Sequence, residues 1–507
     1  MKITSLKGQW IIFFSVALFF LPCATAHGTD YVVLAGQGIQ SDPGWKKVVE
    51  RLVNLHRAEV VDYHKYPSEA LGRLRELYPR YVAVVEKPER IDRQFVMDIN
   101  RMSRQVDDDI YGDFLWGIIT GYDAEAALQL TERAQAPEVV GCAWCLRNQD
   151  FRDGKYFERM GLTDKEGHWY EKDETADSVV CIPYTGSPGQ TVERMLDWVK
   201  DNDPGLIVYQ VEGIRNQLPL FQSVTGEKTG IAESRGGKLW LGKEPLNLGK
   251  HPRIFTTLGR VHTFGTRESI PIALMNSAQV TALLGPVAYT FHGRGKWGTL
   301  KYWLTDAGRF TLAEAHFLNQ QDMLDQLRQW DPRLLEMQCP YEDDPIRTIR
   351  TCYSFYSEFE KKEKENPEQT GDIMNKFGYL YERDIWAYYG DPLWDVRAKD
   401  LSHDRPYEVS SRMKGKKCFV TIRTSPDFSW ERLCGELCES YDSFKDIHCA
   451  VGNLPLCYFF PRRLKNPRLA PRQKQELEVT VNKDFLFVRN AYLEPGKTYR
   501  IVLETDE

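Results

Sequence analysis

The sequence predicts an α/β protein with a mostly parallel sheet between layers of helices, followed by a separate all-β sandwich. Short apolar, β-branched runs alternate with segments of helical spacing through most of the chain. From about Arg405 the pattern changes to short alternating strands separated by turn residues. The chain has 507 residues, of which 42% are hydrophobic and 12% aromatic. That length and composition suit packed cores in roughly two to four domains.

The N-terminal part repeats a strand followed by a helix. Apolar runs predict buried strands, and positions at helical spacing predict helices between them. The expected strands are 31–35, 58–63 and 81–85, and the expected helices are 42–55, 68–77 and 92–104. Gly36 and Gly38 follow the first strand, but the third glycine of a dinucleotide-binding fingerprint is missing. We therefore interpret this glycine pair as a tight strand-to-helix turn.

The stretch from 252 to 304 is expected to carry the functional site. An apolar run predicts a strand at 252–258, and the glycine-bounded segment 259–266 predicts a loop. A helix is expected over 270–284, with Ser269 as its N-cap, and a second strand follows Gly285 and Pro286. In a parallel sheet, the loop that leaves the carboxyl end of a strand is the usual place for chemistry. We therefore expect the loop 259–266 at the centre of the site.

The first 26 residues read as a secretory signal peptide. Lys2 and Lys7 precede an apolar run at 10–21, which is short for a membrane span. The small residues at 24–26 follow it and predict cleavage after Ala26. An uncleaved anchor is the alternative. No later stretch reads as a transmembrane helix, so we expect a secreted, periplasmic or cell-envelope protein.

The cysteines suit an oxidising compartment. Ten of the eleven remain after the expected cleavage, and some are expected to pair. Cys142 and Cys145 have redox spacing, but a structural disulfide, with Cys181 as a candidate partner, is the better interpretation. Five cysteines crowd the C-terminal region, an odd number, so at least one is free or pairs elsewhere. They are Cys418, Cys434, Cys438, Cys449 and Cys457.

Charge restricts the partners and suggests one metal. The formal net charge is -6 without a basic stripe along the sequence, which argues against nucleic acid. The carboxylates of Asp107, Asp108, Asp109 and Asp113 could bind calcium through oxygen ligands, although no calcium-loop pattern is present. In the alternative, these aspartates cap helices, solvate a loop or pair with nearby arginines. Apart from calcium, no cofactor is expected.

Several stretches, taken in their order and spacing, match a known family. They are 42–49, 107–113, 116–124, 273–280, 284–285, 295–298, 308–315 and 389–394. Together they resemble the gingipain-like cysteine peptidases, and most closely a bacterial branch of large secreted or periplasmic members. The resemblance implies a caspase-like, three-layer α/β fold with an immunoglobulin-like β domain after it. The expected division is a signal peptide 1–26, an α/β subdomain 27–140, a catalytic-type domain 141–400 and a β-sandwich 405–507.

The resemblance also implies a catalytic Cys and His, and this sequence lacks both. The His is expected just after the strand at 206–211, where Glu212 and Gly213 stand, and the Cys is expected where Val261 stands. A glycine cannot transfer a proton and a valine cannot form an acyl-enzyme. His262 and His292 could lie in the former cleft, although a hydrogen-bonded loop histidine is the more common role.

We therefore expect a catalytically inactive homologue that binds a polypeptide or another cell-envelope component through the former substrate cleft. The expected cleft-binding residues are Glu212, Arg215, Arg260, Arg267 and Arg294. Their mostly basic side chains would suit an acidic peptide. Two alternatives remain: an active cysteine-type endopeptidase with a displaced dyad, and a structural cell-envelope protein.

Overall fold

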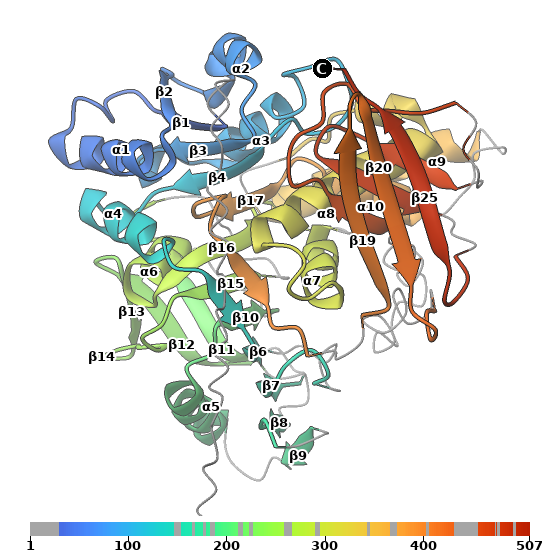
Figure 1. Ribbon diagram of the computed structural model, residues 1–507. Coiled ribbons are helices and arrows are strands. Elements are labelled where there is room, and N and C mark those ends of the chain that lie inside the picture. Colours follow the sequence, from blue (N-terminus) through green and yellow to red (C-terminus); the bar gives the residue numbers. More distant parts are fainter. Residues whose placement is uncertain are drawn as a thin grey trace, which may run out of the picture.

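The computed structural model describes residues 30–506 except 147–153, 165–167, 176–178, 183–187, 211–215, 223–226, 258–265, 289, 291–294, 342–344, 366–372, 402–404, 430–454, 472, 474–476 and 490–492. The predicted signal peptide 1–26 lies outside these residues. A large sheet with helices on its faces forms one part of the structure, and antiparallel sheets at the C-terminal end form the other (Figure 1).

The large sheet has twelve strands, most of them parallel to their neighbours. In spatial order they are β2 (Glu59–Asp62), β1 (Tyr31–Ala35), β3 (Tyr81–Val85), β4 (Leu115–Ile119), β17 (Trp386–Tyr389), β16 (Val280–Pro286), β15 (Arg253–Thr257), β10 (Leu206–Tyr209), β6 (Cys142–Leu146), β7 (Arg159–Thr163), β8 (Trp169–Lys172) and β9 (Val180–Ile182). Antiparallel pairing occurs only between β16 and β17 and at the β7–β8–β9 end. The predicted α/β class with a mostly parallel sheet is confirmed.

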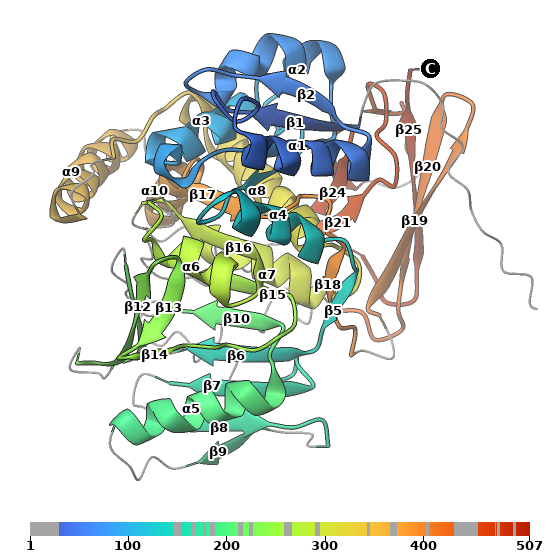
Figure 2. The same ribbon diagram turned by 90° about the vertical axis from the view of Figure 1, so that its left-hand side faces the viewer.

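Helices cover both faces of this sheet. They are α1 (Pro43–His56), α2 (Leu71–Leu77), α3 (Arg93–Met102), α4 (Ala124–Arg133), α5 (Pro188–Asn202), α6 (Ile270–Ser277), α7 (Gly295–Thr305), α8 (Leu312–Trp330) and α10 (Ile373–Glu382). A further helix, α9 (Pro345–Lys364), packs against α10 and projects away from the sheet (Figure 2). Figure 1 shows α1, α4 and α6 along one face and α3, α8 and α7 along the other. The Asp42 carboxylate caps α1 by accepting a hydrogen bond from the Gly44 amide at 3.0 Å. Trp45 and Val48 of α1 are buried at helical spacing, as predicted.

The predicted helix over 270–284 is wrong in its second half. The helix α6 begins after Ser269, as expected, but ends at Ser277. Gln279 then has a φ of 57°, and the chain enters β16 at Val280. All seven residues of β16 are buried, because this strand lies between β15 and β17. A strand buried on both faces is apolar throughout, so its sequence cannot be told from that of a buried helix.

The aromatic run Tyr388-Tyr389 belongs to a central strand, although Gly390, Asp391 and Pro392 directly after it are turn residues. Tyr388 and Tyr389 belong to β17, which pairs antiparallel with β16 and contacts β4 through Tyr389 and Ile118. Aromatic residues suit such a strand because they fill the space between the sheet and its helices. The turn begins only at Gly390, whose φ is 126°. The strand β17 therefore joins the two halves of the large sheet.

The C-terminal part is all-β, as predicted. One antiparallel sheet contains β19 (Tyr407–Lys414), β20 (Lys417–Thr424), β25 (Thr498–Glu504) and β22 (Arg468–Leu469), and a second contains β21 (Leu456–Phe459), β24 (Phe485–Arg489) and β23 (Glu478–Val481). Side chains from both sheets, including Val420, Ile501 and Leu486, form one apolar cluster. This cluster lies between the two antiparallel sheets. Cys457 of β21 and Phe485 and Phe487 of β24 belong instead to the large apolar cluster of the α/β part, so the second sheet packs on both of its faces.

Two smaller sheets complete the described structure. One contains β11 (Gln217–Gln222), β12 (Lys228–Arg235), β13 (Lys238–Leu241) and β14 (Glu244–Pro245), and the other pairs β18 (Val396–Ala398) with β5 (Glu138–Val140). Within the described ranges, no helix is both long and apolar enough to cross a membrane.

Close backbone packing between β4 and the end of β17 predicts a sensitive position. A Cβ on Gly117 would collide with the carbonyl oxygen of Gly390 and come within 3.2 Å of Pro392. The variant Gly117→Ala should lose about 1–3 kcal/mol of unfolding free energy, measured by urea denaturation. The control Gly72→Ala, on α2 with open space around its Cβ, should be neutral or stabilising by up to about 1 kcal/mol. Equal unfolding midpoints for the two variants would contradict this packing.

Candidate functional site

The predicted site lies at one edge of the large sheet. The strands β6, β10, β15 and β16 are parallel in register, so their carboxyl ends meet there. The loops that leave this edge contain most of the predicted site residues. Of these, Glu212, Gly213, Arg215, Arg260, Val261, His262, His292 and Arg294 lie outside the described residues. The structure therefore describes the strands that position the site and only one of its predicted binding residues.

That residue is Arg267, which lies just before α6. Its guanidinium forms an ion pair with Glu89, and it lies 5.9 Å from the centroid of the Tyr122 ring. Glu89 follows β3 and Tyr122 follows β4, so Arg267 connects the loop after β15 with two loops of the other half of the sheet. Both charged side chains are about half exposed. Such an ion pair contributes about 0–1 kcal/mol, so Arg267 can exchange it for a ligand at little cost.

Three buried thiols are poor nucleophiles. Burial raises the pKa of Cys142 and of Cys339 to about 12, and that of Cys352 to about 11. A catalytic cysteine needs the opposite shift, because the thiolate is the attacking species. These three side chains therefore have the environment of structural cysteines.

The expected disulfide among the first three cysteines after the signal peptide is not formed. Cys142 and Cys181 are free thiols, so neither of them is bonded to Cys145. Cys142 and Cys145 are three residues apart on β6, and residues at that separation point to opposite faces of a strand. In the C-terminal region Cys418 and Cys457 are also free, while Cys434, Cys438 and Cys449 lie outside the described residues.

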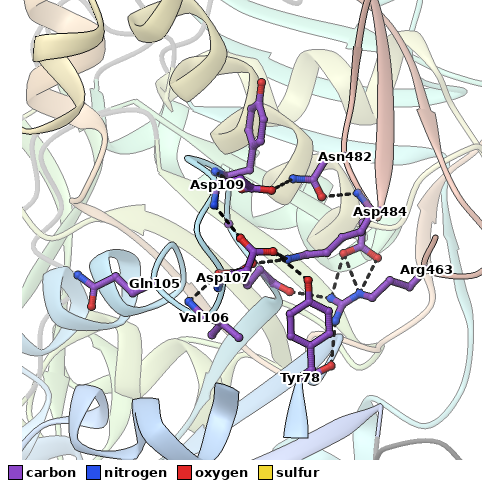
Figure 3. A network of polar contacts seen from close by, with 12 residues as sticks. Tyr78, Gln105, Val106, Asp107, Asp109, Arg463, Asn482 and Asp484 are labelled. Atoms are coloured by element: carbon purple, nitrogen blue, oxygen red, sulfur yellow. Dashed lines mark hydrogen bonds and ion pairs between the residues drawn. The ribbon is translucent and has the colours of Figure 1, made fainter. Parts of the chain in front are cut away.

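The aspartates proposed for calcium lie where the C-terminal sandwich meets the α/β part (Figure 3). Lys483 donates hydrogen bonds to Asp107, at 2.6 Å, and to Asp113. Asn482 donates to Asp109 at 2.7 Å, and Tyr78 donates to Asp107 at 2.8 Å. Asp108, the fourth member, is exposed.

A lysine ammonium is thus the cation that Asp107 and Asp113 face. Burial raises the pKa of Asp107, but the hydrogen bond and charge of Lys483 outweigh this effect and lower it to about 2. Among the residues that the structure describes, no group of three or more His, Cys, Asp and Glu side chains is arranged to hold a metal ion.

Further ion pairs join the sandwich to the α/β part. Asp484 pairs with Arg80 of the α/β part at 3.1 Å, and also with Arg463 of the sandwich itself at 2.9 Å. Arg463 also donates to backbone carbonyls of Tyr78, Pro79 and Asp113 (Figure 3 includes the Tyr78 contact). A second set of ion pairs joins β24 to α8. Arg489 of β24 pairs with Asp322 of α8 and, at 2.8 Å, with Asp325 of the same helix. The acidic segment 107–113 is therefore part of a docking interface.

A small cavity between α3, α8 and β4, lined by both apolar and polar side chains, was not anticipated from the sequence. The centres of water molecules can occupy a volume of about 30 Å³ inside it, which is enough room for about two waters. Polar atoms of His316, Gln320 and Tyr388 line the cavity and have no hydrogen-bond partner within the described structure. Thr299 contacts the other ring nitrogen of His316 at 3.2 Å. In the sequence His316 is one histidine within an amphipathic helix, so only tertiary packing identifies it.

Comparisons with known proteins give weak likenesses. No protein-family model matches the chain, and neither does any curated protein. The crystal structure of the Arg-specific cysteine proteinase gingipain R (RgpB) matches at 10% identity over 96% of this chain and 94% of that chain, with a TM-score of 0.37. The complex of Porphyromonas gingivalis RgpB pro- and mature domains matches at 10% identity over 94% and 93%, with a TM-score of 0.34. A structure described as a protease matches at 9% identity over 78% and 84%, with a TM-score of 0.36. These values assign neither the family nor any residue role.

The Lys483 contacts predict a large effect of one substitution. Lys483→Met leaves the buried carboxylate of Asp113 without its cation, and should lower the unfolding free energy by about 3–5 kcal/mol in urea denaturation. Asp113→Asn in the same chain should recover part of the loss. The matched control is Lys497→Met, which breaks an exposed pair with Glu494 and should cost at most about 1 kcal/mol. Similar losses for Lys483→Met and the control would contradict a buried docking pair.

His316 predicts part of the pH dependence of stability. Burial lowers the pKa of His316 to about 3, whereas in the unfolded chain it is about 6.5. Between these values the unfolded chain binds the extra proton, so the free energy of unfolding falls as the pH is lowered from 6.5. His316→Gln should flatten this slope by up to about 1.4 kcal/mol per pH unit, measured by urea denaturation from pH 7 to pH 4. The exposed His64→Gln should leave the slope unchanged, and an unchanged slope in His316→Gln would refute this assignment.

Proposed function

We propose that the chain is a secreted, gingipain-like peptidase homologue that does not cleave its ligand and instead binds a polypeptide. The binding site is the edge formed by the carboxyl ends of β6, β10, β15 and β16. In this proposal the large sheet and its helices correspond to the caspase-like fold of that family, and the C-terminal sandwich to its immunoglobulin-like domain.

One observation carries the proposal. The loops that leave the carboxyl ends of the parallel strands β6, β7, β10, β15 and β16 are 147–158, 164–168, 210–216, 258–269 and 287–294, and none of them contains a cysteine. A cysteine peptidase that acts at this edge needs its thiol on one of these loops, because the strands themselves are buried. The stretch between Cys181 and Cys339 has no cysteine and supplies the loops after β10, β15 and β16, so these three loops offer no thiol at the proposed site.

The surrounding residues support the same proposal. The thiols of Cys142, Cys339 and Cys352 are buried and have raised pKa values, so they do not replace the missing nucleophile. His262 and His292 stand on the loops of this edge, but no thiol on these loops is available for them to deprotonate.

The charges of the edge indicate the kind of polypeptide. Three of these loops, 210–216, 258–269 and 287–294, carry Arg215, Arg260, Arg267 and Arg294 against Glu212 and Glu268. An excess of arginine favours carboxylate ligands, which arginine holds with two parallel hydrogen bonds. We propose an acidic peptide segment as the ligand and the cell envelope or the exterior as the location, since residues 1–26 read as a signal peptide.

The test uses the mature protein from His27 onward. Labelled acidic and basic peptides are titrated with protein and followed by fluorescence anisotropy, and casein hydrolysis is assayed with and without a thiol alkylator. We expect binding of the acidic peptide and no hydrolysis. The variant Arg215→Glu/Arg260→Glu/Arg294→Glu should weaken acidic-peptide binding by at least about tenfold, since each lost charge-assisted contact is worth about 1.5 kcal/mol or more.

The control is Lys361→Glu/Lys362→Glu/Lys364→Glu on α9, which makes the same change in net charge on exposed lysines. It should leave peptide binding unchanged. Casein hydrolysis that alkylation abolishes would show an active peptidase with a displaced dyad. No peptide binding and no hydrolysis together would favour a structural envelope protein.

A further inference from the structure

The turn between β19 and β20 carries a dense group of cations. Residues 412–417 read Arg-Met-Lys-Gly-Lys-Lys, with four basic side chains and no acidic one, in a chain whose net charge is -6. All six residues are exposed. Gly415 has a φ of 57°, which suits the tight turn that brings the lysines together. We call residues 412–417 together with Arg468 the basic rim.

The strand register concentrates this charge further. Lys414 stands directly opposite Lys417, which in turn stands opposite Glu504. On the other side of Glu504, the next strand places Arg468 opposite the same carboxylate. One cross-strand row therefore contains three cations, Lys414, Lys417 and Arg468, and a single carboxylate, that of Glu504. The carboxylate of Asp506 is a second acidic group nearby, 3.5 Å from the Arg468 guanidinium. Like charges directly opposite each other destabilise a sheet, and a bound anionic surface would remove that repulsion.

Apolar side chains are exposed beside these cations. Met413, Phe419 and Leu469 are 50%, 37% and 38% exposed. They are three of the eight large hydrophobic residues exposed in the described structure, and all three lie at this end of the sandwich. Phe419 stands opposite Arg412 on the face that carries the cations. Met413 and Leu469 lie in the row of buried Cys418 and Leu503, on the other face, at the two outer edges of the sheet. A dissolved polyanion would use only the cations, whereas a lipid surface would use the cations and the apolar side chains together.

The position of the basic rim leaves it accessible. Figure 2 shows the turn between β19 and β20 at the outer end of the sandwich, beside the end of the chain marked C. The Thr505 amide donates a hydrogen bond to the Lys416 carbonyl at 2.8 Å, which fixes the turn against the C-terminal segment. A turn that is already fixed loses little conformational entropy when it binds.

We propose that the basic rim binds an anionic lipid surface through its cations, with Phe419 from the charged face and Met413 from the end of β19 beside the turn entering the headgroup region. This proposal is independent of the peptide site, which lies at an edge of the large sheet. Each lysine or arginine near such a surface strengthens partitioning about fivefold, so four together give on the order of several hundred-fold. Because the contacts are exposed, salt should screen them.

The test is sedimentation of the mature protein with vesicles. We expect binding to phosphatidylcholine vesicles that contain about one third phosphatidylglycerol, no binding to pure phosphatidylcholine vesicles, and a loss of about tenfold or more when salt is raised from 50 mM to 500 mM. The variant Lys414→Glu/Lys416→Glu/Lys417→Glu should lose on the order of 100-fold in partitioning. The α9 variant Lys361→Glu/Lys362→Glu/Lys364→Glu is the matched control and should bind as the wild type does.

Two further measurements distinguish lipid binding from general binding of polyanions and from misfolding of the variants. Met413→Ser/Phe419→Ser should weaken binding to anionic vesicles several-fold while leaving retention on immobilised polyphosphate unchanged. Thermal unfolding of each variant shows whether the sandwich is intact, and the salt series on the wild type needs no variant at all. Binding to polyphosphate or to an acidic protein without binding to anionic vesicles would overturn the lipid assignment, as would equal binding to neutral vesicles.

Discussion

One buried turn carries the densest set of polar contacts between the C-terminal sandwich and the α/β part. Asn482, Lys483 and Asp484 connect β23 to β24, and all three are buried. Each bonds to a different group of the α/β part: Asn482 to Asp109, Lys483 to Asp107 and Asp113, and Asp484 to Arg80. A buried charge without a partner costs several kcal/mol, so these pairs form only when both parts are folded and in register. The turn thereby fixes the position of the sandwich.

This arrangement gives the acidic segment at 107–113 a structural role. A cluster of carboxylates in a loop has the composition of a cation site, and here the sandwich supplies the cation as a lysine. The lysine also fixes distance and direction, because its hydrogen bonds to Asp107 and Asp113 require the hairpin β23–β24 to enter from one side. The segment can therefore hold two domains together, which a loop saturated by water or a mobile ion would not do.

The two proposed sites lie on different parts of this assembly. The polypeptide site uses the general property of parallel sheets that all loops at one edge converge, and its charges come from arginines on those loops. The proposed lipid site uses a different kind of surface, a sheet face and hairpin turn where cations outnumber carboxylates and where Met413 and Phe419 are exposed. Since the sandwich is joined firmly to the large sheet, binding at the basic rim would hold the peptide site at a defined distance from an anionic surface.

Local signals in the sequence determined the class of fold and much of its order. The strand and helix at 31–56, with Asp42 as the cap, follow from a β-branched run, a capping residue and helical spacing, and these act within a few residues of each other. The change to antiparallel strands after Arg405 is local in the same way. The position of the site edge also follows from the sequence, because alternating strands and helices already imply parallel strands with converging carboxyl ends.

Only the tertiary structure decided the remaining features, because they join residues far apart in the chain. The segment 280–286 is a strand since β15 and β17 pair with it on both sides, and nothing within the segment separates that outcome from a helix. Cys142 and Cys145 are near in sequence but point to opposite faces of β6. Asp107 accepts a hydrogen bond from Lys483, which is 376 residues away in the chain. Lys414, Lys417 and Glu504 lie in one row only because of the register in which their strands pair. The charged residues can be counted in the sequence, but the tertiary structure determines which of them form ion pairs.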